Sequence, residues 1–322
     1  MNVKSIQILS LLVFSVSISC KNESSLEKEI NTLEMDFVVE RFDEVFSKTT
    51  TKELPKIKQV YPFLFPERIP DSVWITTINS DLQKQMFSEG VKQFPDFKSE
   101  KESFENLFKH VKYYDKTFKT PRVITVADGV DYRNKLVLQA DLLIINLMNY
   151  LGEEHEFYQN IPVYFAERMK PSQITPEIAE KYAMKYAHQS QRKTFLDEII
   201  YHGKLLYFKD VMIPSFSDAD KIGYSQEDIN WAEINEVQIW SHFVENEMLF
   251  STDPKLFTRF TIPAPFSKFY LDIDNDSPGR LGQYIGWQIV RAYAEHSDVD
   301  IISLMQAESD QIFKKSKYKP KR

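Results

Sequence analysis

Six histidines offer the most direct route to catalytic chemistry in this chain. A common hydrolytic zinc site carries two histidines four residues apart on a helix, with a glutamate directly after the first, so that both imidazoles face the metal. His155 is followed by Glu156, but position 159 is glutamine, and no other histidine has a partner at that spacing. His202 stands alone before Gly203. Three protein ligands would have to come from scattered positions, so the sequence does not predict catalytic zinc.

Other motifs with known chemistry are incomplete or absent. Asp272, Asp274 and Asp276 alternate as at the start of a calcium-binding loop, but Ser277 and Gln283 stand where such a loop needs a glycine and a bidentate glutamate. The chain contains neither the Gly-x-Ser-x-Gly turn of serine hydrolases nor a Gly-x-x-x-x-Gly-Lys phosphate loop. We therefore expect a solvated acidic loop at 272–276, and we expect neither a metal nor a cofactor.

The single cysteine, Cys20, directly follows a short hydrophobic leader. Lys4 precedes an apolar stretch at 6–18, and Ser19 lies just before the cysteine, an order typical of a signal peptide. The stretch is shorter than the roughly 20 residues that a transmembrane helix needs. A cysteine at the cleavage site indicates a bacterial lipoprotein, in which residues 1–19 are removed and the Cys20 thiol carries a diacylglycerol. The alternative is an ordinary secretory signal with an incidental cysteine.

The composition is that of a globular, acidic protein. Hydrophobic residues make up 43% of the chain, which is enough for a core. The net charge is −7 although the last nine residues contain six Lys or Arg, so the body is more acidic still. Such a body argues against nucleic acid as a partner. The basic end at 314–322 is expected to be a solvated tail, with contact to anionic lipid or to an acidic protein as the alternative.

The spacing of apolar residues predicts a mainly α-helical fold with a small β-sheet in the first half, an α+β arrangement. Strands are expected at 37–42, 122–126 and 136–138, the last two as a hairpin around Asp128 and Gly129. Helices are expected at 52–60, 71–91, 141–151, 194–210, 225–250, 279–295 and 301–313. A further helix is expected to begin at a capping box formed by Ser99 and Glu102. Another is expected from Thr175, as its cap, to about 188. We expect one globular domain at 34–313 behind a polar tether at 20–33.

The helix after Pro278 contains three of the eight glycines, Gly279, Gly282 and Gly286. Gly282 and Gly286 are four residues apart and share one helix face, where another backbone could approach closely. We favour tight packing of a core helix, and the alternative is the floor of a groove for a ligand or partner. The residues that would border such a groove are His202, Glu233, Asn235, Glu236, Trp240, Arg280, Gln283 and Trp287.

Several blocks of the sequence resemble one known family. The run from Ser277 to Arg291, Ser-Pro-Gly-Arg-Leu-Gly-Gln-Tyr-Ile-Gly-Trp-Gln-Ile-Val-Arg, is similar to the C-terminal signature of the gliding-motility lipoprotein GldB of Bacteroidetes. Further blocks match in the same order over nearly the whole mature chain, at 150–158, 200–204, 222–224, 235–240, 250–254, 263–266 and 316–320. On these blocks the chain is identified as a member of the GldB family.

The resemblance implies a lipid-anchored envelope protein that cells need to glide over surfaces, a process tied to the type IX secretion machinery. It supplies no catalytic residue. The family's arrangement is distantly similar to zinc peptidases, so we expect a zincin-like helical domain that lacks the metal motif. We therefore expect a non-enzymatic protein of the cell envelope that faces the periplasm and binds other gliding or type IX secretion proteins. Anchoring in the inner and in the outer membrane both stay open.

A second hypothesis belongs to a different class of function. It describes an envelope hydrolase with an unorthodox site built from His202, Glu233, Glu236 and Arg280 around the final glycine-rich helix. The two hypotheses differ in one structural respect, which is whether these four side chains converge on a cleft.

Overall fold

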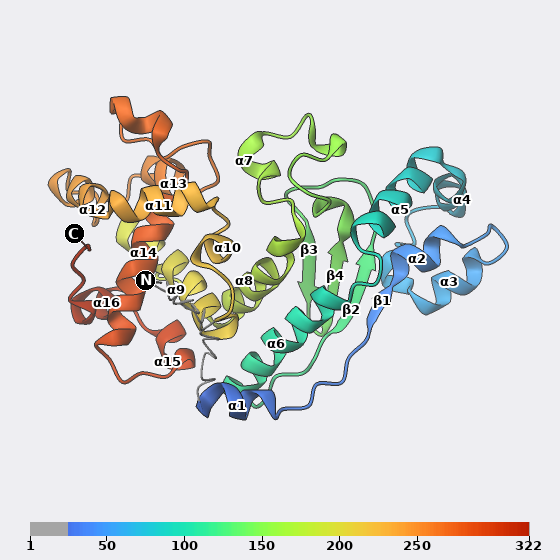
Figure 1. Cartoon of the computed structure of the whole chain (residues 1–322), viewed down its shortest axis with the longest axis horizontal. Helices are drawn as coiled ribbons and strands as arrows, with labels where there is room; N and C mark the ends of the chain where they lie inside the picture. The colour runs from blue at the N-terminus through green and yellow to red at the C-terminus, as the bar shows by residue number, and fades with distance from the viewer. Residues whose placement is uncertain (1–24, 322) are drawn as a thin grey trace, which may run out of the picture.

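The computed structural model describes residues 25–321, so the predicted leader and the lipidation site Cys20 lie outside the described residues. Within this range the fold is mainly α-helical with one small sheet, which confirms the α+β prediction. Figure 1 shows the sheet with its helices on the right and a larger group of helices on the left. No helix among residues 25–321 is long and apolar enough to cross a membrane.

A four-stranded mixed sheet forms the centre of the N-terminal part. Its strands are β1 (Val39–Arg41), β2 (Arg122–Val126), β3 (Leu136–Gln139) and β4 (Leu142–Asn146). They lie in the order β1-β2-β4-β3, with β1, β2 and β4 parallel and β3 antiparallel to β4. The predicted hairpin of 122–126 with 136–138 is therefore wrong, because β4 lies between these two strands. β3 pairs instead with β4, through a tight turn in which Ala140 adopts a φ of 50°.

The helix predicted at 141–151 is also wrong. Its first residues form β4, and a 3-10 helix, η2 (Leu147–Asn149), follows. A short apolar run fits a buried helix and a strand covered on both faces equally well, and periodicity does not separate the two. β4 is of the second kind, because it lies between β2 and β3 and helices cover both faces of the sheet.

Alternate residues of the strands face two separate cores. On one face Val123 and Leu143 belong to the main core, together with the apolar side of α6 (Lys98–Tyr114). On the other face Ile124 packs with the aromatic residues of α2 (Phe42–Ser47) and with Phe65. This second core also takes side chains from α3 (Leu54–Val60), η1 (Pro62–Leu64), α4 (Asp71–Asn79) and α5 (Asp81–Gln93).

Two helix boundaries in this part differ from the prediction. The helix predicted at 71–91 is divided at Ser80, whose Oγ accepts a hydrogen bond from the amide of Gln83 (3.4 Å) and caps α5. The capping box predicted at Ser99 is wrong, because α6 begins at Lys98, whose amide donates to the Asp96 side chain (3.0 Å). Ser80 is thus the N-cap of α5, whereas Phe97 directly before α6 makes no side-chain cap bond and the acceptor comes from Asp96, one residue earlier.

The C-terminal part is helical. Its elements are η3 (Glu156–Tyr158), α7 (Val163–Ala166), η4 (Pro171–Gln173), α8 (Ile174–Tyr186), α9 (Phe195–Met212), α10 (Asp218–Ile222), α11 (Gln226–Ile234), α12 (Glu236–Glu245), α13 (Pro254–Phe260), η5 (Asp272–Asp276), α14 (Leu281–Glu295), α15 (Ile301–Gln306) and α16 (Ser309–Ser316). The starts predicted at Thr194 and Ser225 are confirmed by capping boxes with Asp197 and Asp228. The helices predicted at 225–250 and 301–313 are each divided in two. Thr175 does not cap α8, which begins one residue earlier after Gln173.

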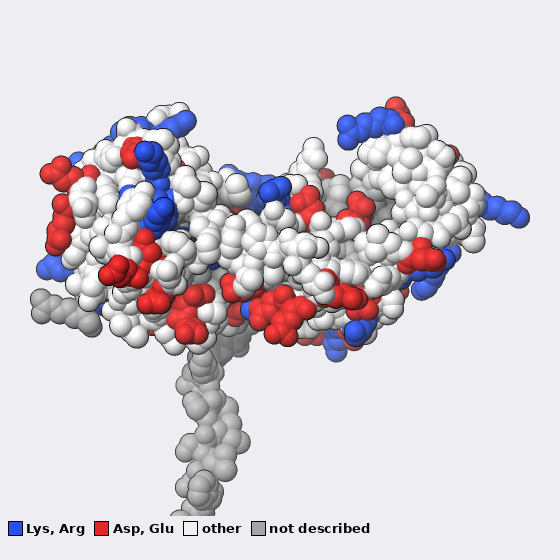
Figure 2. Space-filling model, turned by 90° about the horizontal axis from the view of Figure 1, so that it is seen from above, with Lys and Arg blue, Asp and Glu red and all other residues white. Residues whose placement is uncertain are grey.

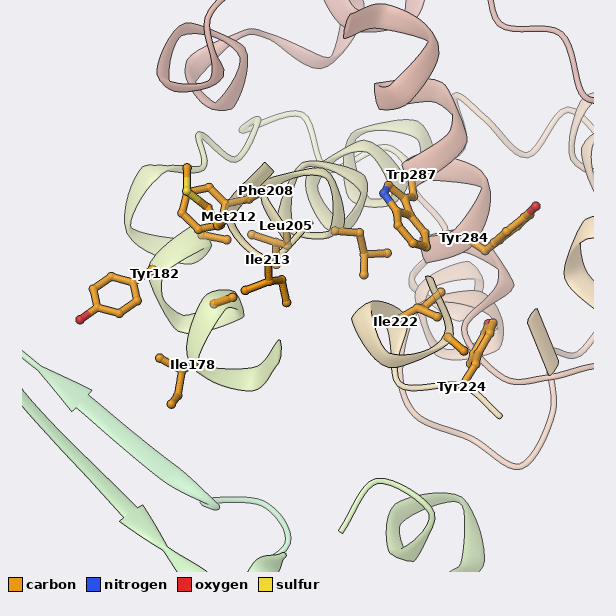
Figure 3. Packing of buried hydrophobic residues seen from close by; sticks show 14 of the residues in the cluster. Ile178, Tyr182, Leu205, Phe208, Met212, Ile213, Ile222, Tyr224, Tyr284 and Trp287 are labelled. Atoms are coloured by element: carbon orange, nitrogen blue, oxygen red, sulfur yellow. The ribbon is translucent and has the colours of Figure 1, made fainter. Parts of the chain in front are cut away.

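Helices α8, α9, α10 and α14 share one core. Figure 3 shows Tyr182 from α8, Phe208 from α9, Ile222 from α10 and Trp287 from α14 among the side chains that fill it. All four are at most 4% exposed. Since α9 and α14 supply residues to this core along most of their length, they form the frame on which the other C-terminal helices are placed.

Both ends of the described chain pack against the body. The segment expected to be a polar tether includes a short helix, α1 (Ser25–Asn31), whose Ile30 is fully buried. Helix α1 lies beside α6, where the Tyr113 hydroxyl donates to Glu29 (3.2 Å). At the other end, the segment expected to be a solvated tail begins inside α16, and its Tyr318 packs edge-on against Trp240, with ring centroids 5.1 Å apart.

Candidate functional site

The glycines of α14 lie where this helix crosses α9. A Cβ atom on Gly286 would overlap the carbonyl oxygen of Ile199, and one on Gly203 would overlap the carbonyl of Gly286. A Cβ atom on Gly282 would come within 2.8 Å of the Phe260 carbonyl oxygen. The backbones of α9 and α13 therefore occupy the face that the two α14 glycines leave open, and this face is a helix contact, as we favoured, and not the floor of a groove.

Two of the predicted groove residues, Glu236 and Trp240, meet at the C-terminal tail. Glu236 is 2% exposed, and its carboxyl oxygens accept hydrogen bonds from the hydroxyls of Tyr284 (3.0 Å) and Tyr318 (2.9 Å) and from the Lys321 amide (3.0 Å). Burial, with Glu236 close by, raises the pKa of both tyrosines. These bonds fasten the chain end to α12 and α14.

Removing the Tyr318 hydroxyl tests this fastening. We expect Tyr318→Phe to lower the free energy of unfolding by about 1–2 kcal/mol, because a buried carboxyl oxygen of Glu236 loses one of its donors. Urea unfolding followed by circular dichroism measures the change. Tyr270→Phe is the control, since Tyr270 is 65% exposed and the same substitution there should change stability by less than about 0.5 kcal/mol. Equal effects of the two substitutions would show that the tail is not fastened in this way.

Three further predicted residues lie on α14 or just before it, and each holds a different neighbour. Arg280 donates to the carbonyl oxygens of Ile222 (2.7 Å) and Gly223 (3.0 Å), which places a cation at the C-terminal end of α10. Burial, reinforced by the charge of Arg168, lowers the pKa of Arg280 to about 10. Gln283 donates to the Thr261 carbonyl, and the Trp287 indole donates to Asp210 (2.8 Å).

The remaining predicted residues are spread over two elements. Glu233 is exposed on α11, and the Asn235 side chain donates to the Trp231 carbonyl (2.9 Å) at the end of the same helix. His202 lies on α9, where its Nε2 is 3.7 Å from Glu198 and its side chain is 25% exposed. Of the four proposed hydrolase residues, Arg280 lies near enough to His202 for its charge to lower the pKa of His202.

Burial lowers the pKa of His202 to about 4, with the cations Arg280 and Lys209 acting in the same direction and Glu180 opposing them. The unfolded chain, with an ordinary histidine pKa near 6.5, therefore binds more protons than the folded chain between pH 4 and 6.5.

Stability is accordingly expected to be complete above pH 6.5 and to fall through this group by up to about 3 kcal/mol as the pH drops to 4. His202→Gln should flatten this fall in denaturant unfolding measured from pH 4 to 7. His296→Gln, at an exposed position, is the control for replacing a histidine with glutamine. A slope that His202→Gln does not alter would contradict the assignment.

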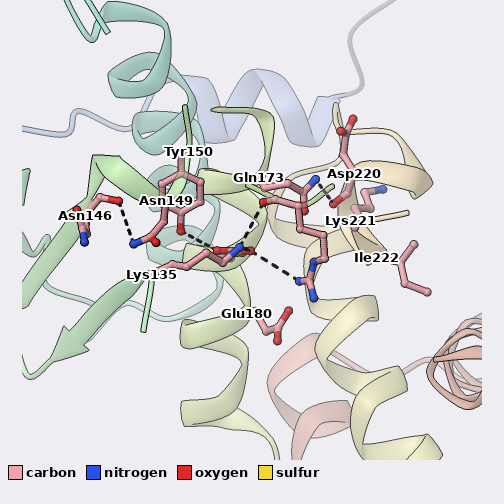
Figure 4. Close-up of polar contacts among 12 residues, drawn as sticks. Lys135, Asn146, Asn149, Tyr150, Gln173, Glu180, Asp220, Lys221 and Ile222 are labelled. Atoms are coloured by element: carbon pink, nitrogen blue, oxygen red, sulfur yellow. Dashed lines mark hydrogen bonds and ion pairs between the residues drawn. The ribbon is translucent and has the colours of Figure 1, made fainter. Parts of the chain in front are cut away.

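A cluster of charged side chains joins the two parts of the molecule, and sequence reasoning missed it. Lys135, at the start of β3, pairs with Glu177 on α8, and the same carboxylate accepts from the Tyr150 hydroxyl (2.6 Å). Nearby, Lys209 on α9 pairs with Glu180 (2.7 Å) and also donates to the Lys221 carbonyl (2.8 Å). Figure 4 shows Tyr150 and Lys135 arriving from the sheet side and Glu180 from the helical side.

The electrostatics of this cluster are those of ion pairs. Burial raises the pKa of Glu180, but the cations Lys209 and Arg168 outweigh it, so the pKa lies below its usual range. Burial lowers the pKa of Lys135 against the opposing pull of Glu177. A cavity of about 320 Å³ borders the cluster, and Figure 2 shows the surface hollowed between two lobes, with blue and red side chains on the floor. Lys209 directly follows the apolar run at 205–208 of α9, and a lysine at that position was a signal in the sequence that could have indicated the cluster.

The acidic loop at 272–276 is only partly the solvated segment that we expected. Asp272 and Asp276 are exposed, but Asp274 is buried and accepts hydrogen bonds from the amides of Phe269 and Tyr270 (2.9 Å each). Within residues 25–321, no group of three or more His, Cys, Asp or Glu side chains is placed to hold a metal ion. The zincin-like character of the helical domain stays a prediction.

Comparison with models of known protein families gives a match to the family described as "Gliding motility protein GldB", over residues 23–320. The chain belongs to the GldB family. No curated protein and no solved structure matches the chain significantly. Membership of the GldB family connects the chain to gliding motility and, through the family's lipoprotein designation, to the cell envelope.

Residues that carry the family resemblance form hydrogen bonds that shape the turn before α14. Ser277 donates to the carbonyl oxygens of Ser267 (3.1 Å) and Asp274 (2.8 Å), and the Ser267 hydroxyl accepts from the Leu281 amide (3.1 Å). These bonds fix the turn that leads into α14. The GldB signature at 277–291 thus encodes the start of α14 and its contact with α9.

Proposed function

We propose that this GldB-family chain is a non-enzymatic lipoprotein, anchored through Cys20 and facing the periplasm, that supports gliding by binding other proteins of the gliding or type IX secretion machinery. The family match over residues 23–320 carries this proposal. The leader that ends at Cys20 supports the anchor.

The contacts of the ionisable side chains support a binding role over a catalytic one. Arg280 is engaged by two backbone carbonyls, and Glu236 is engaged by two tyrosines and a backbone amide. General acid–base catalysis needs groups free to exchange protons with a substrate within hydrogen-bond reach. The envelope hydrolase stays the alternative, but its four residues lie at separate places on α9, α11, α12 and the turn before α14.

Gliding of a deletion strain on glass tests the proposal. We expect deletion cells to be immobile, the wild-type gene to restore gliding, and Cys20→Ala to fail to restore it although the protein is made. As a matched control, Ser24→Ala changes a residue four positions after the cysteine, outside the leader, and should restore gliding. Normal gliding of the deletion strain would contradict the proposed function. Full rescue by Cys20→Ala would show that this function does not need a lipid anchor at Cys20.

A further inference from the structure

Strand β3 is an edge strand, because it pairs with β4 on one side and with no other strand among the described residues. Lys135, just before β3, lies opposite Asn146 and accepts a hydrogen bond from its amide (3.1 Å). Hydrogen-bonded and non-hydrogen-bonded residue pairs alternate along an antiparallel ladder. The amides and carbonyls of Leu136 and Leu138 therefore point away from β4, and within residues 25–321 they form no hydrogen bond on that side. β3 thus presents unpaired backbone donors and acceptors at its free edge, where another chain could pair.

Helix α8 runs beside this edge. Its Glu177 pairs with Lys135 at the start of β3, and its Lys185 donates to the carbonyl oxygen of Ala140 just after the strand (3.4 Å). Figure 1 shows α8 next to β3, on the side where the helical part of the molecule lies. The cavity of about 320 Å³ lies between the two elements, and both Lys181 and the first residue of β3 line it. The edge is therefore open at the beginning of β3.

Two lysines of α8 follow Glu177 at intervals of four residues and share its helix face. Lys181 is exposed and forms neither an ion pair nor a hydrogen bond within the described residues. Lys185 is also exposed, donates only to the Ala140 carbonyl and lies over the Tyr182 ring at 5.2 Å. Neither lysine has a carboxylate partner within residues 25–321.

The other charged side chains around the cavity have oppositely charged neighbours. They are Arg133 with Asp131, Lys135 and Arg168 with Glu177, and Glu180 with Lys209. Asp141, in the turn after β3, is exposed and pairs with neither Lys181 nor Lys185. Two uncompensated positive charges therefore lie along the edge of β3, although the chain as a whole carries a net charge of −7. An acidic occupant would be attracted to this edge.

The spacing of the two lysines matches that of alternate residues on a strand. Four residues of an α-helix rise about 6 Å, and two residues of a β-strand rise about 6.6 Å. Side chains at positions i and i+2 of an added strand point to the same face, so two acidic ones can meet Lys181 and Lys185 together. A second copy of this chain does not fit, because pairing of two β3 edges would bring the lysines of both copies together.

We propose that the free edge of β3 binds an extended segment of a partner protein in which two Asp or Glu residues stand at positions i and i+2. The backbone of this segment pairs with Leu136 and Leu138 as an added strand, and its two carboxylates meet Lys181 and Lys185. Main-chain pairing supplies affinity for any extended chain, and the two lysines select an acidic one. The inference rests on the proposed function only in that the partner belongs to the gliding machinery.

The direct test uses the purified full-length protein and the capped peptide acetyl-Val-Glu-Val-Glu-Val-amide. We expect the peptide to slow hydrogen exchange of the Leu136 and Leu138 amides about tenfold, because both gain an acceptor. Calorimetric titration gives the affinity, and acetyl-Val-Lys-Val-Lys-Val-amide should bind about tenfold more weakly. Unchanged exchange of both amides at millimolar peptide, or equal affinity for the two peptides, would overturn the inference.

Methylation of the peptide backbone tests the pairing itself. In an added strand, the amides of alternate residues face β3 and the others face solvent. One peptide is methylated at the amides of both glutamates, and a second at the amides of the three valines. We expect one of them to keep its affinity and the other to lose it about tenfold, since only one set of amides donates to β3. Equal affinity of the two methylated peptides would contradict strand addition.

Reversing the charge of the two lysines tests the selection of acidic residues. The variant with both Lys181→Glu and Lys185→Glu should reverse the preference, so that acetyl-Val-Lys-Val-Lys-Val-amide binds more tightly than the glutamate peptide. The control carries the same charge change at two exposed lysines away from β3, Lys56→Glu on α3 and Lys255→Glu on α13, and should keep the wild-type preference. The same preference in both variants would show that Lys181 and Lys185 do not select the occupant.

Complementation separates this inference from the proposed function. The variant with Lys181→Glu and Lys185→Glu should fail to restore gliding to a deletion strain in which the control variant succeeds. If deletion cells glide normally while the peptide binds as expected, the proposed function fails and the binding site stands. If deletion cells are immobile and the peptide does not bind, the function stands and the site fails.

Discussion

Gly286→Ala is expected to lower the free energy of unfolding by more than about 3 kcal/mol, the upper end of the usual cost of overpacking a core. The new methyl group would overlap the Ile199 carbonyl, which is backbone and cannot rotate away. The crossing of α9 and α14 would have to open, and Trp287 and Tyr284, both nearly fully buried, would lose their packing with it. Urea unfolding followed by far-ultraviolet circular dichroism measures the loss.

Gly90→Ala is the matched control for this prediction. Gly90 also lies inside a helix, α5, but a Cβ there would meet only the terminal methyl of Met148 at 3.2 Å, the far end of a flexible side chain. Alanine is favoured over glycine inside a helix by about 1 kcal/mol, so this variant should match or exceed the wild type in stability. Similar stability of the two alanine variants would mean that the helices do not cross as closely as described.

Asp210→Ala is expected to cost up to about 3–5 kcal/mol, because Lys221 and Arg291 then keep only Asp218 as a partner and the Trp287 indole loses its acceptor. The Asp210 carboxylate is 15% exposed and accepts from Trp287 (2.8 Å), from two nitrogens of Arg291 (2.7 and 2.8 Å) and from Lys221 (3.0 Å). Arg291 in turn stacks on the Trp287 ring at 3.8 Å and reaches Asp218 on α10. One carboxylate thus links α9, α10 and α14.

An exposed ion pair supplies the comparison for Asp210→Ala. Glu153 pairs with Lys170 at 2.8 Å, but both side chains are at least one-third exposed, and Glu153→Ala should cost less than about 1 kcal/mol. Asp210→Asn should fall between the two, since the amide oxygen still accepts from the Trp287 indole while the charge is lost. Equal costs for Asp210→Ala and Glu153→Ala would refute the view that the buried network joins the three helices.

Several helix starts and the positions of β1, β2 and β3 were predictable from local sequence, but the identity of β4 and the pairing of the strands were not. Capping residues such as Thr194 and Ser225 determine where a helix begins through hydrogen bonds to residues three positions away. The local sequence is therefore enough to predict these helix starts. The identity of β4 depends on which strands lie on either side of it, and no residue within Leu142–Asn146 carries that information. The helix breaks at Asn235 and Ala307 contain no glycine or proline, so the local sequence gives no signal for them.

The sequence indicated candidate groove residues that do make contacts between elements, but it did not indicate which of these residues lie together. Glu236 and Trp240 both contact Tyr318 of the tail, whereas Arg280 and Trp287 each belong to a separate contact between elements. The charged cluster around Glu177 and Glu180 draws on residues tens of positions apart. Only the packing of the sheet against the helices brings them together.

The early start of α1 limits how far the body can stand from the membrane. Four residues lie between Cys20 and Ser25, and the five residue-to-residue steps span no more than about 18 Å when fully extended. With Cys20 lipidated as proposed, the protein would be held close to the membrane surface, with α1 and the neighbouring end of α6 turned toward the lipid headgroups. Figure 1 shows α1 at the bottom of the molecule and the carboxyl edge of the sheet on the side away from it. The carboxyl edge of the sheet would then face away from the bilayer, where a partner could reach it.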